Sequence, residues 1–218
     1  GSDTMGLAIP IETSARHIHM CQEDFEHLFG KGKTLTHRVD LSQPGQYACE
    51  ERVTIKGPKG TFENVALLGP FRNETQVEIS MTDSRKLGIP GIIRQSGDTK
   101  GTPGCTLLGP AGAIELDHGV IVAKRHIHMT PVQAVQLNVK DKDEVFVIME
   151  SFERSLIFAD VVVRVHPDFA LAMHVDTDEA NAFAGHEHPT GVILKLFGGR
   201  TYNLRKWADE LQSGINRL

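Results

Sequence analysis

Cysteine is scarce in this sequence, which has only three cysteines in 218 residues and no pair at Cys-x-x-Cys spacing. An odd number of scattered cysteines argues against a disulfide framework, and it leaves too few thiols for a cysteine-rich zinc site. Such cysteine use is typical of a reducing compartment. We therefore expect a cytoplasmic protein without disulfide bonds.

The sequence also lacks long apolar runs and an excess of positive charge. No stretch approaches the roughly 18 to 20 consecutive apolar residues that a membrane-spanning helix needs. The net charge of -5 offers no basic surface for a nucleic acid. We expect neither a membrane nor a nucleic acid among the partners of the protein.

Aromatic residues are few, at 6% of the chain, whereas valine and isoleucine are frequent and 21 residues are glycine. Branched side chains favour strands, and glycines favour the turns between them. A chain of 218 residues is also long enough for one or two domains. The composition predicts a mainly β protein built from short strands.

One pentapeptide occurs twice, because residues 16–20 (Arg-His-Ile-His-Met) return as residues 125–129. In a strand, residues i and i+2 face the same side, so each copy places two imidazoles together while the isoleucine enters a core. A single His-x-His pair can arise by chance or belong to a hydrogen-bonded core. Two identical copies favour metal binding instead.

The similarity between the two halves extends beyond the pentapeptides. Two further pairs of segments match, 62–65 with 158–161 and 76–83 with 172–178. In this alignment Glu78 and His174 occupy equivalent positions on predicted strands. The chain is therefore predicted to be internally duplicated.

Each half of the duplication supplies three candidate metal ligands. They are His17, His19 and Glu78 in the first half, and His126, His128 and His174 in the second. Three protein ligands with one open position are typical of catalytic zinc, whereas a closed structural site uses four. Such ligands suit Zn²⁺, Co²⁺, Ni²⁺ or Cu²⁺, and two Zn²⁺ per chain are the default expectation. Considered alone, Glu78 and His174 could equally be surface residues of a strand.

A candidate anion site lies beside the predicted Glu78 strand. Arg72 follows a Gly-Pro turn just before that strand, and its guanidinium can donate two parallel hydrogen bonds to a phosphate oxyanion. Ser96 and Gly97, at the end of another predicted strand, can add a hydroxyl and a backbone N–H to the same anion. The alternative for Arg72 is an ordinary surface arginine.

Two helices have clear signals in the sequence. Thr130 can cap a helix with Pro131 at its first position and Gln133 completing a capping box. An amphipathic helix is predicted at the C-terminus, where apolar residues share one helical face. These residues are Leu204, Trp207, Ala208, Leu211, Ile215 and Leu218. Such a face can dock on the protein itself or bind a partner.

Together, these motifs resemble the PduL-type phosphate acyltransferases of propanediol utilisation and related bacterial microcompartments. The resemblance spans about residues 9–198, which is nearly the whole chain. It rests on the two Arg-His-Ile-His-Met copies and on the segments 68–72, 76–80, 95–97, 174–176 and 179–182.

The resemblance implies a fold of two β-barrels capped by short α-helices, with the two metals between the barrels. Residues 6–15 and 124–198 would form barrel 1, residues 16–33 and 51–123 barrel 2, residues 34–50 a two-stranded lid, and residues 199–218 a helical tail. The duplication alone would divide the chain near Lys124. It does not predict that the N-terminal strand joins the C-terminal half.

The resemblance also implies an activity, the direct transfer of an acetyl or propionyl group between coenzyme A and phosphate, which makes or consumes an acyl phosphate. Gln46, in the implied lid, would join Arg72 and Ser96 in binding the phosphate. A homodimer is implied as well. So is a location inside a bacterial microcompartment, where the helical tail could bind a shell or lumen partner.

Two other functions fit the same candidate ligands. A two-metal phosphoesterase or thioesterase would hydrolyse its substrate, although such phosphoesterases usually rely on bridging aspartates rather than histidines. A non-catalytic, zinc-stabilised scaffold protein of a microcompartment would have no turnover. Release of free thiol from acetyl-CoA, measured with and without phosphate, distinguishes these alternatives.

Overall fold

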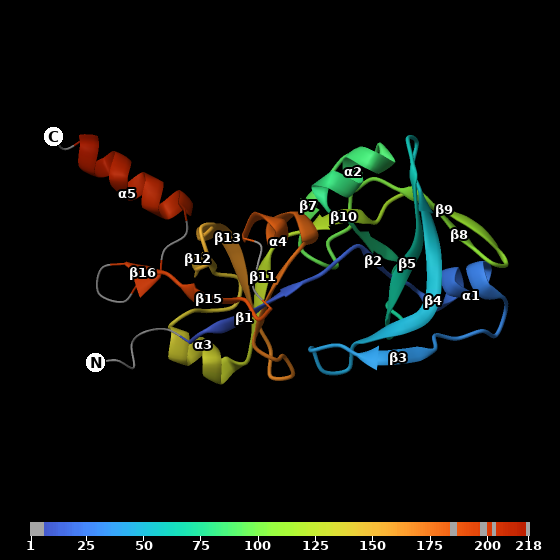
Figure 1. The fold of residues 1–218 in the computed structure, drawn as a ribbon, viewed down its shortest axis with the longest axis horizontal. Coiled ribbons are helices and arrows are strands. Elements are labelled where there is room, and N and C mark those ends of the chain that lie inside the picture. Colours follow the sequence, from blue (N-terminus) through green and yellow to red (C-terminus); the bar gives the residue numbers. More distant parts are fainter. Residues whose placement is uncertain (1–6, 184–186, 197–199, 202–203, 217–218) are drawn as a thin grey trace. The chain divides into compact units, whose positions relative to one another are not determined.

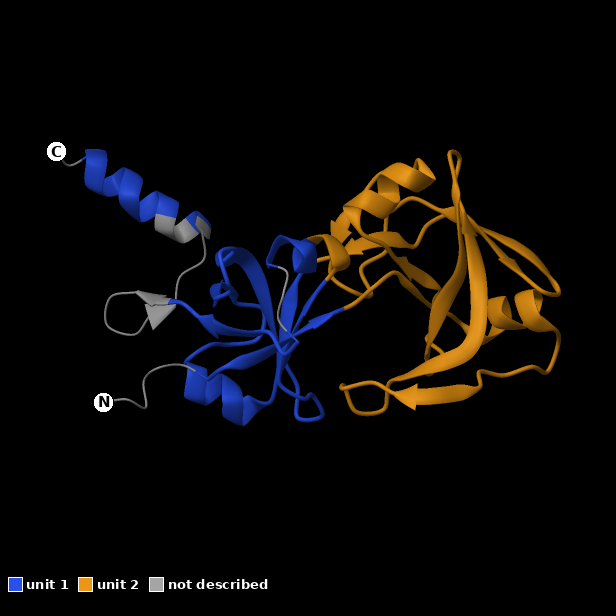
Figure 2. Cartoon of the chain, viewed as in Figure 1, with its two compact units in different colours: residues 1–13, 125–175, 179–218 blue, residues 14–124, 176–178 orange. Residues whose placement is uncertain are grey.

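The computed structural model describes residues 7–183, 187–196, 200–201 and 204–216. They form two compact units (Figure 2). Unit 1 contains residues 7–13, 125–175 and the described residues after 178, and unit 2 contains residues 14–124 and 176–178. Unit 1 therefore takes its first strand from the opposite end of the chain. The division into barrels, lid and tail at the residues given above stays a prediction.

Unit 1 is built around a closed barrel of six strands, in the order β1-β14-β11-β13-β12-β15 (Figure 1). Its strands are β1 (Ile9–Thr13), β11 (His126–Met129), β12 (Glu144–Met149), β13 (Leu156–Val165), β14 (Ala172–Val175) and β15 (Thr190–Ile193). Their inward side chains form an apolar core, in which Ile127 and Met129 are fully buried. The remaining elements of this region are α3 (Pro131–Leu137), α4 (Thr177–Phe183), α5 (Leu204–Asn216) and the small sheet of β16 (Lys195–Leu196) with β17 (Arg200–Thr201).

Unit 2 contains a nine-stranded sheet that curls around a second apolar core, in the order β7-β10-β6-β2-β5-β4-β8-β9, with β3 paired to β4. Its strands are β2 (His17–His19), β3 (His37–Asp40), β4 (Tyr47–Lys56), β5 (Thr61–Gly69), β6 (Gln76–Glu78), β7 (Ile93–Arg94), β8 (Cys105–Gly109), β9 (Gly112–Leu116) and β10 (Val120–Ala123). The helices α1 (Gln22–Phe29) and α2 (Met81–Leu87) follow β2 and β6.

The strand registers confirm the internal duplication. β2 runs antiparallel to β6 with His17 opposite Glu78, and β11 runs antiparallel to β14 with His126 opposite His174. Each His-x-His strand is also followed by a short helix, α1 or α3. Glu78 and His174 are therefore equivalent positions. The predicted mainly β, duplicated fold is confirmed, with one barrel closed and the second sheet curled into a half-barrel.

The two halves of the duplication exchange a strand. β1 directly precedes β2 in the chain, yet it pairs in parallel with β14 of unit 1. β10 directly precedes β11, yet it pairs in parallel with β6 of unit 2. The positions beside β14 and beside β6 are equivalent in the two sheets. Each is occupied by a strand that, in the sequence, directly precedes the His-Ile-His strand of the other half.

Helix capping follows the sequence signals. The hydroxyl of Thr130 accepts from the backbone N–H of Gln133 at 3.3 Å, and the side-chain oxygen of Gln133 accepts from the N–H of Thr130 at 2.9 Å. This confirms the predicted capping box of α3, whose first turn holds Pro131. Ser80 and Asp83 form the same reciprocal arrangement at the start of α2. That cap sets the point where β6 ends and α2 begins.

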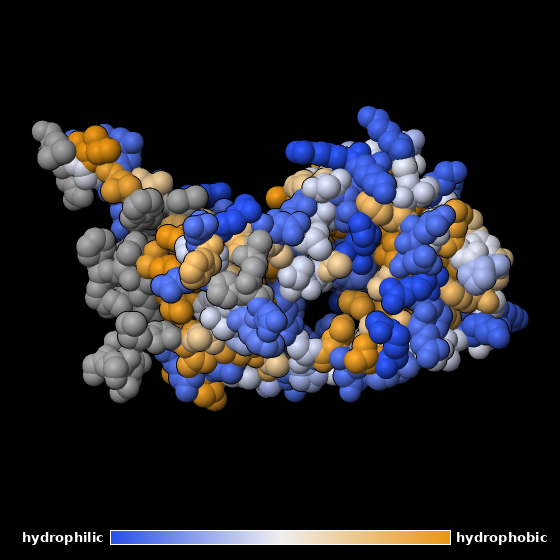
Figure 3. Space-filling model, viewed as in Figure 1, coloured by the Kyte–Doolittle hydropathy of each residue, from blue (hydrophilic) through white to orange (hydrophobic). Residues whose placement is uncertain are grey.

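The predicted C-terminal helix is α5, whereas Leu218 lies outside the described residues. Leu211 is 50% exposed and Ile215 is 61% exposed, and Figure 3 shows apolar side chains on the surface of this helix. Within the described ranges, no helix is both long and apolar enough to cross a membrane. The exposed part of α5 therefore carries apolar surface on a short helix.

Candidate metal and anion site

The two His-Ile-His strands present their histidines on the face opposite the core. Ile18 is fully buried in the core of unit 2, and Ile127 is fully buried in the core of unit 1. Because side chains alternate along a strand, the histidines on either side point away from the core. His17 and His19 are nevertheless only 6% and 5% exposed. Imidazoles this well buried on an outer face indicate a site rather than a solvated surface.

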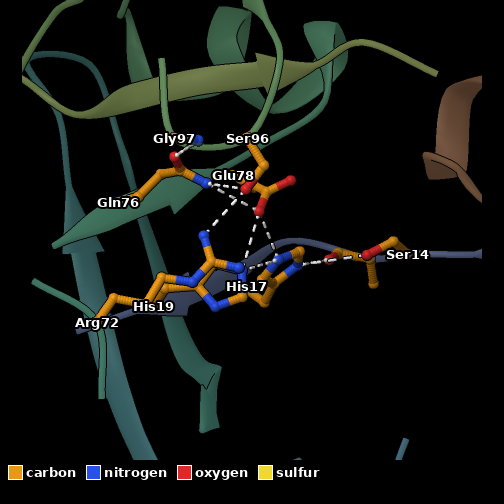
Figure 4. Close-up of polar contacts among 9 residues, drawn as sticks. Ser14, His17, His19, Arg72, Gln76, Glu78, Ser96 and Gly97 are labelled. Atoms are coloured by element: carbon orange, nitrogen blue, oxygen red, sulfur yellow. Dashed lines mark hydrogen bonds and ion pairs between the residues drawn. The ribbon is translucent and has the colours of Figure 1, made fainter. Parts of the chain in front are cut away.

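The first cluster joins His17, His19 and Glu78 (Figure 4). The two Nε2 atoms lie 3.1 Å apart, and Glu78 Oε2 lies 2.9 Å from that of His17 and 3.0 Å from that of His19. A tetrahedral zinc ion with bonds of about 2.0–2.1 Å separates its ligand atoms by about 3.3 Å. The spacing of the three atoms is close to this value, so the donor set fits zinc.

Burial and mutual attraction set the protonation of this cluster. Burial opposes ionisation of Glu78, but the charge of His17 and the hydrogen bonds from both imidazoles outweigh it and hold the pKa of the carboxyl well below its usual value. Burial also lowers the pKa of His19, to about 4. For His17 the attraction of Glu78 outweighs burial, and the pKa is raised. Glu78 is thus ionised and His19 neutral, which are the forms that a metal ion binds.

The second cluster joins His126, His128 and His174, whose ligand nitrogens lie within 4.8 Å of one another. The Nδ1 atoms of His128 and His174 are 3.1 Å apart. Burial lowers the pKa of His128 to about 2, and the neighbouring imidazoles act in the same direction. His128 is therefore neutral at physiological pH. Three imidazoles form a ligand set that fits zinc with an open position.

In each cluster, one histidine has its second ring nitrogen occupied. His17 Nδ1 lies 2.8 Å from the carbonyl oxygen of Ala15, and His174 Nε2 lies 3.1 Å from Glu12 Oε2. Hydrogen bonds of this kind fix the tautomer and aim the other nitrogen at a metal. Glu12 was not among the predicted site residues. Its one signal is its place on the predicted strand just before the first pentapeptide.

Arg72 and Ser96 meet beside the first cluster, since Arg72 Nη1 donates to Ser96 Oγ at 3.0 Å. Gln76, which is buried, connects this pair to the cluster (Figure 4). Its Nε2 group donates to Ser96 Oγ at 3.0 Å and to Glu78 Oε2 at 3.1 Å. A continuous chain of polar contacts therefore links the arginine to a candidate metal ligand. Gln76 was not among the predicted site residues.

Two other residues of the predicted anion site have different surroundings. The backbone N–H of Gly97 donates to Gln76 Oε1 at 2.7 Å, so it stabilises Gln76 instead of facing an anion. Gln46 lies in the turn between β3 and β4, where its N–H donates to the carbonyl of Gln43 and its carbonyl accepts from Leu41. The predicted part of Gln46 in phosphate binding stays a prediction.

The fold and the site define a duplicated, mainly β protein with two candidate three-ligand metal centres, and Arg72 is hydrogen-bonded to Ser96 beside the first of them. Comparison with known families gives the class of enzyme. The model of the phosphate propanoyltransferase family matches residues 10–186. The chain belongs to this family and is an acyltransferase.

Curated relatives named phosphate propanoyltransferase cover most of the chain. The Thermotoga maritima protein is 58% identical over 80% of this chain and 83% of the relative. The Enterococcus faecalis protein is 53% identical over 85% of this chain and 87% of the relative. The Salmonella typhimurium protein is 53% identical over 88% of this chain and 90% of the relative. These similarities confirm the resemblance to phosphate acyltransferases that the motifs indicated.

Proposed function

We propose that this acyltransferase moves a short acyl group, acetyl or propionyl, between coenzyme A and inorganic phosphate. In one direction a phosphate oxygen attacks the thioester carbonyl, a C–O bond forms, the C–S bond breaks, and coenzyme A leaves as a thiolate that takes up a proton. The products are an acyl phosphate and free coenzyme A. The observation that carries this proposal is the polar chain that links Arg72 through Ser96 and Gln76 to Glu78.

The proposal gives the two clusters and the arginine separate tasks. His17, His19 and Glu78 would hold one zinc ion, and His126, His128 and His174 would hold the other. When bound, zinc supplies an open coordination position and polarises an oxygen of the thioester or the phosphate. Arg72 neutralises the phosphate and orients it for attack, Ser96 Oγ supplies a further hydrogen bond, and Gln46 joins them from the β3–β4 turn. Positioning of the two substrates then supplies much of the rate.

The experiment that tests this function follows free thiol from acetyl-CoA or propionyl-CoA, with and without phosphate, on the zinc-loaded protein. Release that depends on phosphate, together with formation of the acyl phosphate, is the expected result. Release that does not need phosphate would identify a thioesterase. Zinc binding without any release would favour the non-catalytic scaffold. Release of phosphate from a phosphomonoester would identify a phosphoesterase.

Direct transfer without an acyl-enzyme predicts that the cysteines are dispensable. Burial raises the pKa of Cys49 to about 11 and that of Cys105 to about 12, so both thiols stay protonated at neutral pH and are weak nucleophiles. We expect a variant with Cys21→Ser, Cys49→Ala and Cys105→Ala to keep its kcat for phosphate-dependent thiol release. Loss of activity in a folded variant, or radiolabel from acetyl-CoA retained on the wild-type protein without phosphate, would contradict direct transfer.

We also propose that the protein is a homodimer and that α5 binds a partner within a bacterial microcompartment. The exposure of Leu211 and Ile215 supports a helix that contributes little to the core. Deletion of residues 203–218 should therefore leave thiol release and the melting temperature nearly unchanged. A large fall in melting temperature would show instead that α5 docks on its own chain or on the second copy. Light scattering on both forms gives the oligomeric state.

A further inference from the structure

Each metal cluster lies on a row of residues that crosses three neighbouring strands. In unit 2 the row runs from Ile121 on β10 through Glu78 on β6 to His17 on β2. In unit 1 it runs from Glu12 on β1 through His174 on β14 to His126 on β11. Residues paired in register on adjacent strands lie on the same face of the sheet. The exchanged strands thus add a third residue to the face that carries each cluster.

The two rows differ in where their carboxylate stands. In unit 2 the central position is Glu78, a candidate ligand, and the outer position is the fully buried Ile121. In unit 1 the central position is the imidazole of His174, and the outer position is Glu12. Each row therefore contains one carboxylate. It stands on the central strand, β6, in unit 2 and on the outer strand, β1, in unit 1.

We propose that Glu12 is a positioning residue of the all-histidine metal centre, a role that rests on the zinc centre of the proposed function and not on acyl transfer itself. Glu12 Oε2 lies 3.1 Å from His174 Nε2 and accepts a hydrogen bond from its N–H group. In this tautomer, Nδ1 of His174 is the unprotonated nitrogen, which is the form that binds a metal. That atom is the one that lies 3.1 Å from Nδ1 of His128, inside the cluster.

Two physical effects make such a carboxylate useful at this place. A hydrogen bond from imidazole to carboxylate fixes the orientation of the ring and makes its other nitrogen a stronger donor to a metal. Three neutral imidazoles also bring no charge to a divalent cation, whereas the first cluster has the charge of Glu78. Glu12 supplies the missing negative charge through His174. The strand exchange is what delivers it, because β1 is the neighbour of β14.

The test measures zinc affinity rather than activity. Wild-type protein and the variants Glu12→Ile, Glu12→Gln and Glu150→Gln are stripped of metal and titrated with Zn²⁺ against a chromophoric chelator. Glu12→Ile installs the residue of the equivalent position in unit 2, and Glu12→Gln keeps a hydrogen-bond acceptor without the charge. Glu150, an exposed carboxylate directly after β12, is the control in the same unit. The melting temperature of each metal-free variant reports on its fold.

We expect Glu12→Ile to weaken one of the two zinc sites about 10- to 100-fold, as loss of such a partner usually does. Glu12→Gln should cause a smaller loss at the same site, and Glu150→Gln none. Because Glu12 acts through His174, adding Glu12→Ile to His174→Ala should cause no further loss. Wild-type affinities in a folded Glu12→Ile variant, or additive losses in the double variant, would overturn the proposal.

The outcome of this titration is independent of the acyl-transfer assay. Two zinc sites that respond to Glu12 as expected, in a protein without phosphate-dependent thiol release, would refute the proposed function and leave the role of Glu12 standing. Phosphate-dependent thiol release with unchanged zinc affinities in both Glu12 variants would support the proposed function and refute the role of Glu12. A wild-type protein that binds no zinc would overturn both the zinc centres and the role of Glu12.

Discussion

Replacing Arg72 by alanine should lower phosphate-dependent thiol release by about 30- to 1000-fold, which corresponds to about 2–4 kcal/mol for the loss of a charge partner of the transition state. The guanidinium is held by the hydrogen bond from Nη1 to Ser96 Oγ, and the backbone N–H of Arg72 donates to the carbonyl of Met20 at 2.9 Å. These contacts hold Arg72 beside the first cluster, where the proposed function places the phosphate. Steady-state kcat and the KM for phosphate, measured at saturating acyl-CoA, give the size of the effect.

Two further variants make the Arg72 result specific. Arg72→Lys keeps the charge but not the planar pair of donors, so it should retain part of the activity with a raised KM for phosphate. Arg52→Ala removes an exposed arginine of β4 in the same unit and should change nothing. Zinc content should equal that of the wild type in all three proteins. Unchanged phosphate kinetics in Arg72→Ala would exclude Arg72 from the phosphate site.

Most of the local structure at this site could be predicted from sequence periodicity. The His-x-His spacing predicts that two imidazoles share one face of a strand, and the structure places His17 and His19 in this way. The equivalence of Glu78 and His174 followed from aligning the two halves, and both registers agree with it. These features depend on residues that are neighbours in one strand or that repeat at a fixed spacing. Patterns of that kind are visible in a single sequence.

The exchange of β1 and β10 could not be predicted in the same way. Periodicity shows that a segment is a strand, but it does not show which strand will be its neighbour, because pairing depends on tertiary packing. Glu12 was missed for this reason, since its role arises only when β1 lies beside β14. Gln76 was missed for a related reason. Alternation places it on the face of Glu78, yet its bond to Ser96 joins residues of separate segments.

The two candidate clusters differ in the polar contacts beside them. Beside Glu78, Gln76 holds both Ser96 Oγ and the backbone N–H of Gly97, and this fixes the loop next to Arg72. In the second half the position equivalent to Gln76 is Ala172, which also lies opposite the second histidine of its pentapeptide. Alanine has no polar group to hold such a loop. Among the described residues, both halves therefore have a candidate three-ligand cluster, and the contacts centred on Gln76 belong to unit 2.

Glu78→Ala and His174→Ala should each remove one metal and abolish acyl transfer. Wild-type protein should hold two zinc ions per chain, one in each described cluster. Losing one of three protein ligands costs affinity heavily, whereas the other cluster keeps its complete set, so each variant should retain about one zinc. Loss of a ligand's hydrogen-bond partner usually lowers activity about 10- to 100-fold. If both metals act together on the phosphate and the thioester, loss of a ligand itself should lower activity by more than this.

Metal analysis after gel filtration in metal-free buffer, run beside the thiol assay, measures both effects. Glu78→Gln is the matched variant of the first cluster, because it keeps the size of the side chain and removes the charge that the two imidazoles stabilise. The zinc bound at the first cluster should fall in this variant as well, since an amide oxygen is a much weaker ligand for zinc than a carboxylate. Two zinc ions retained in Glu78→Ala would show that this carboxylate is not a ligand. A single zinc ion in the wild-type protein would contradict two separate zinc centres of three ligands each.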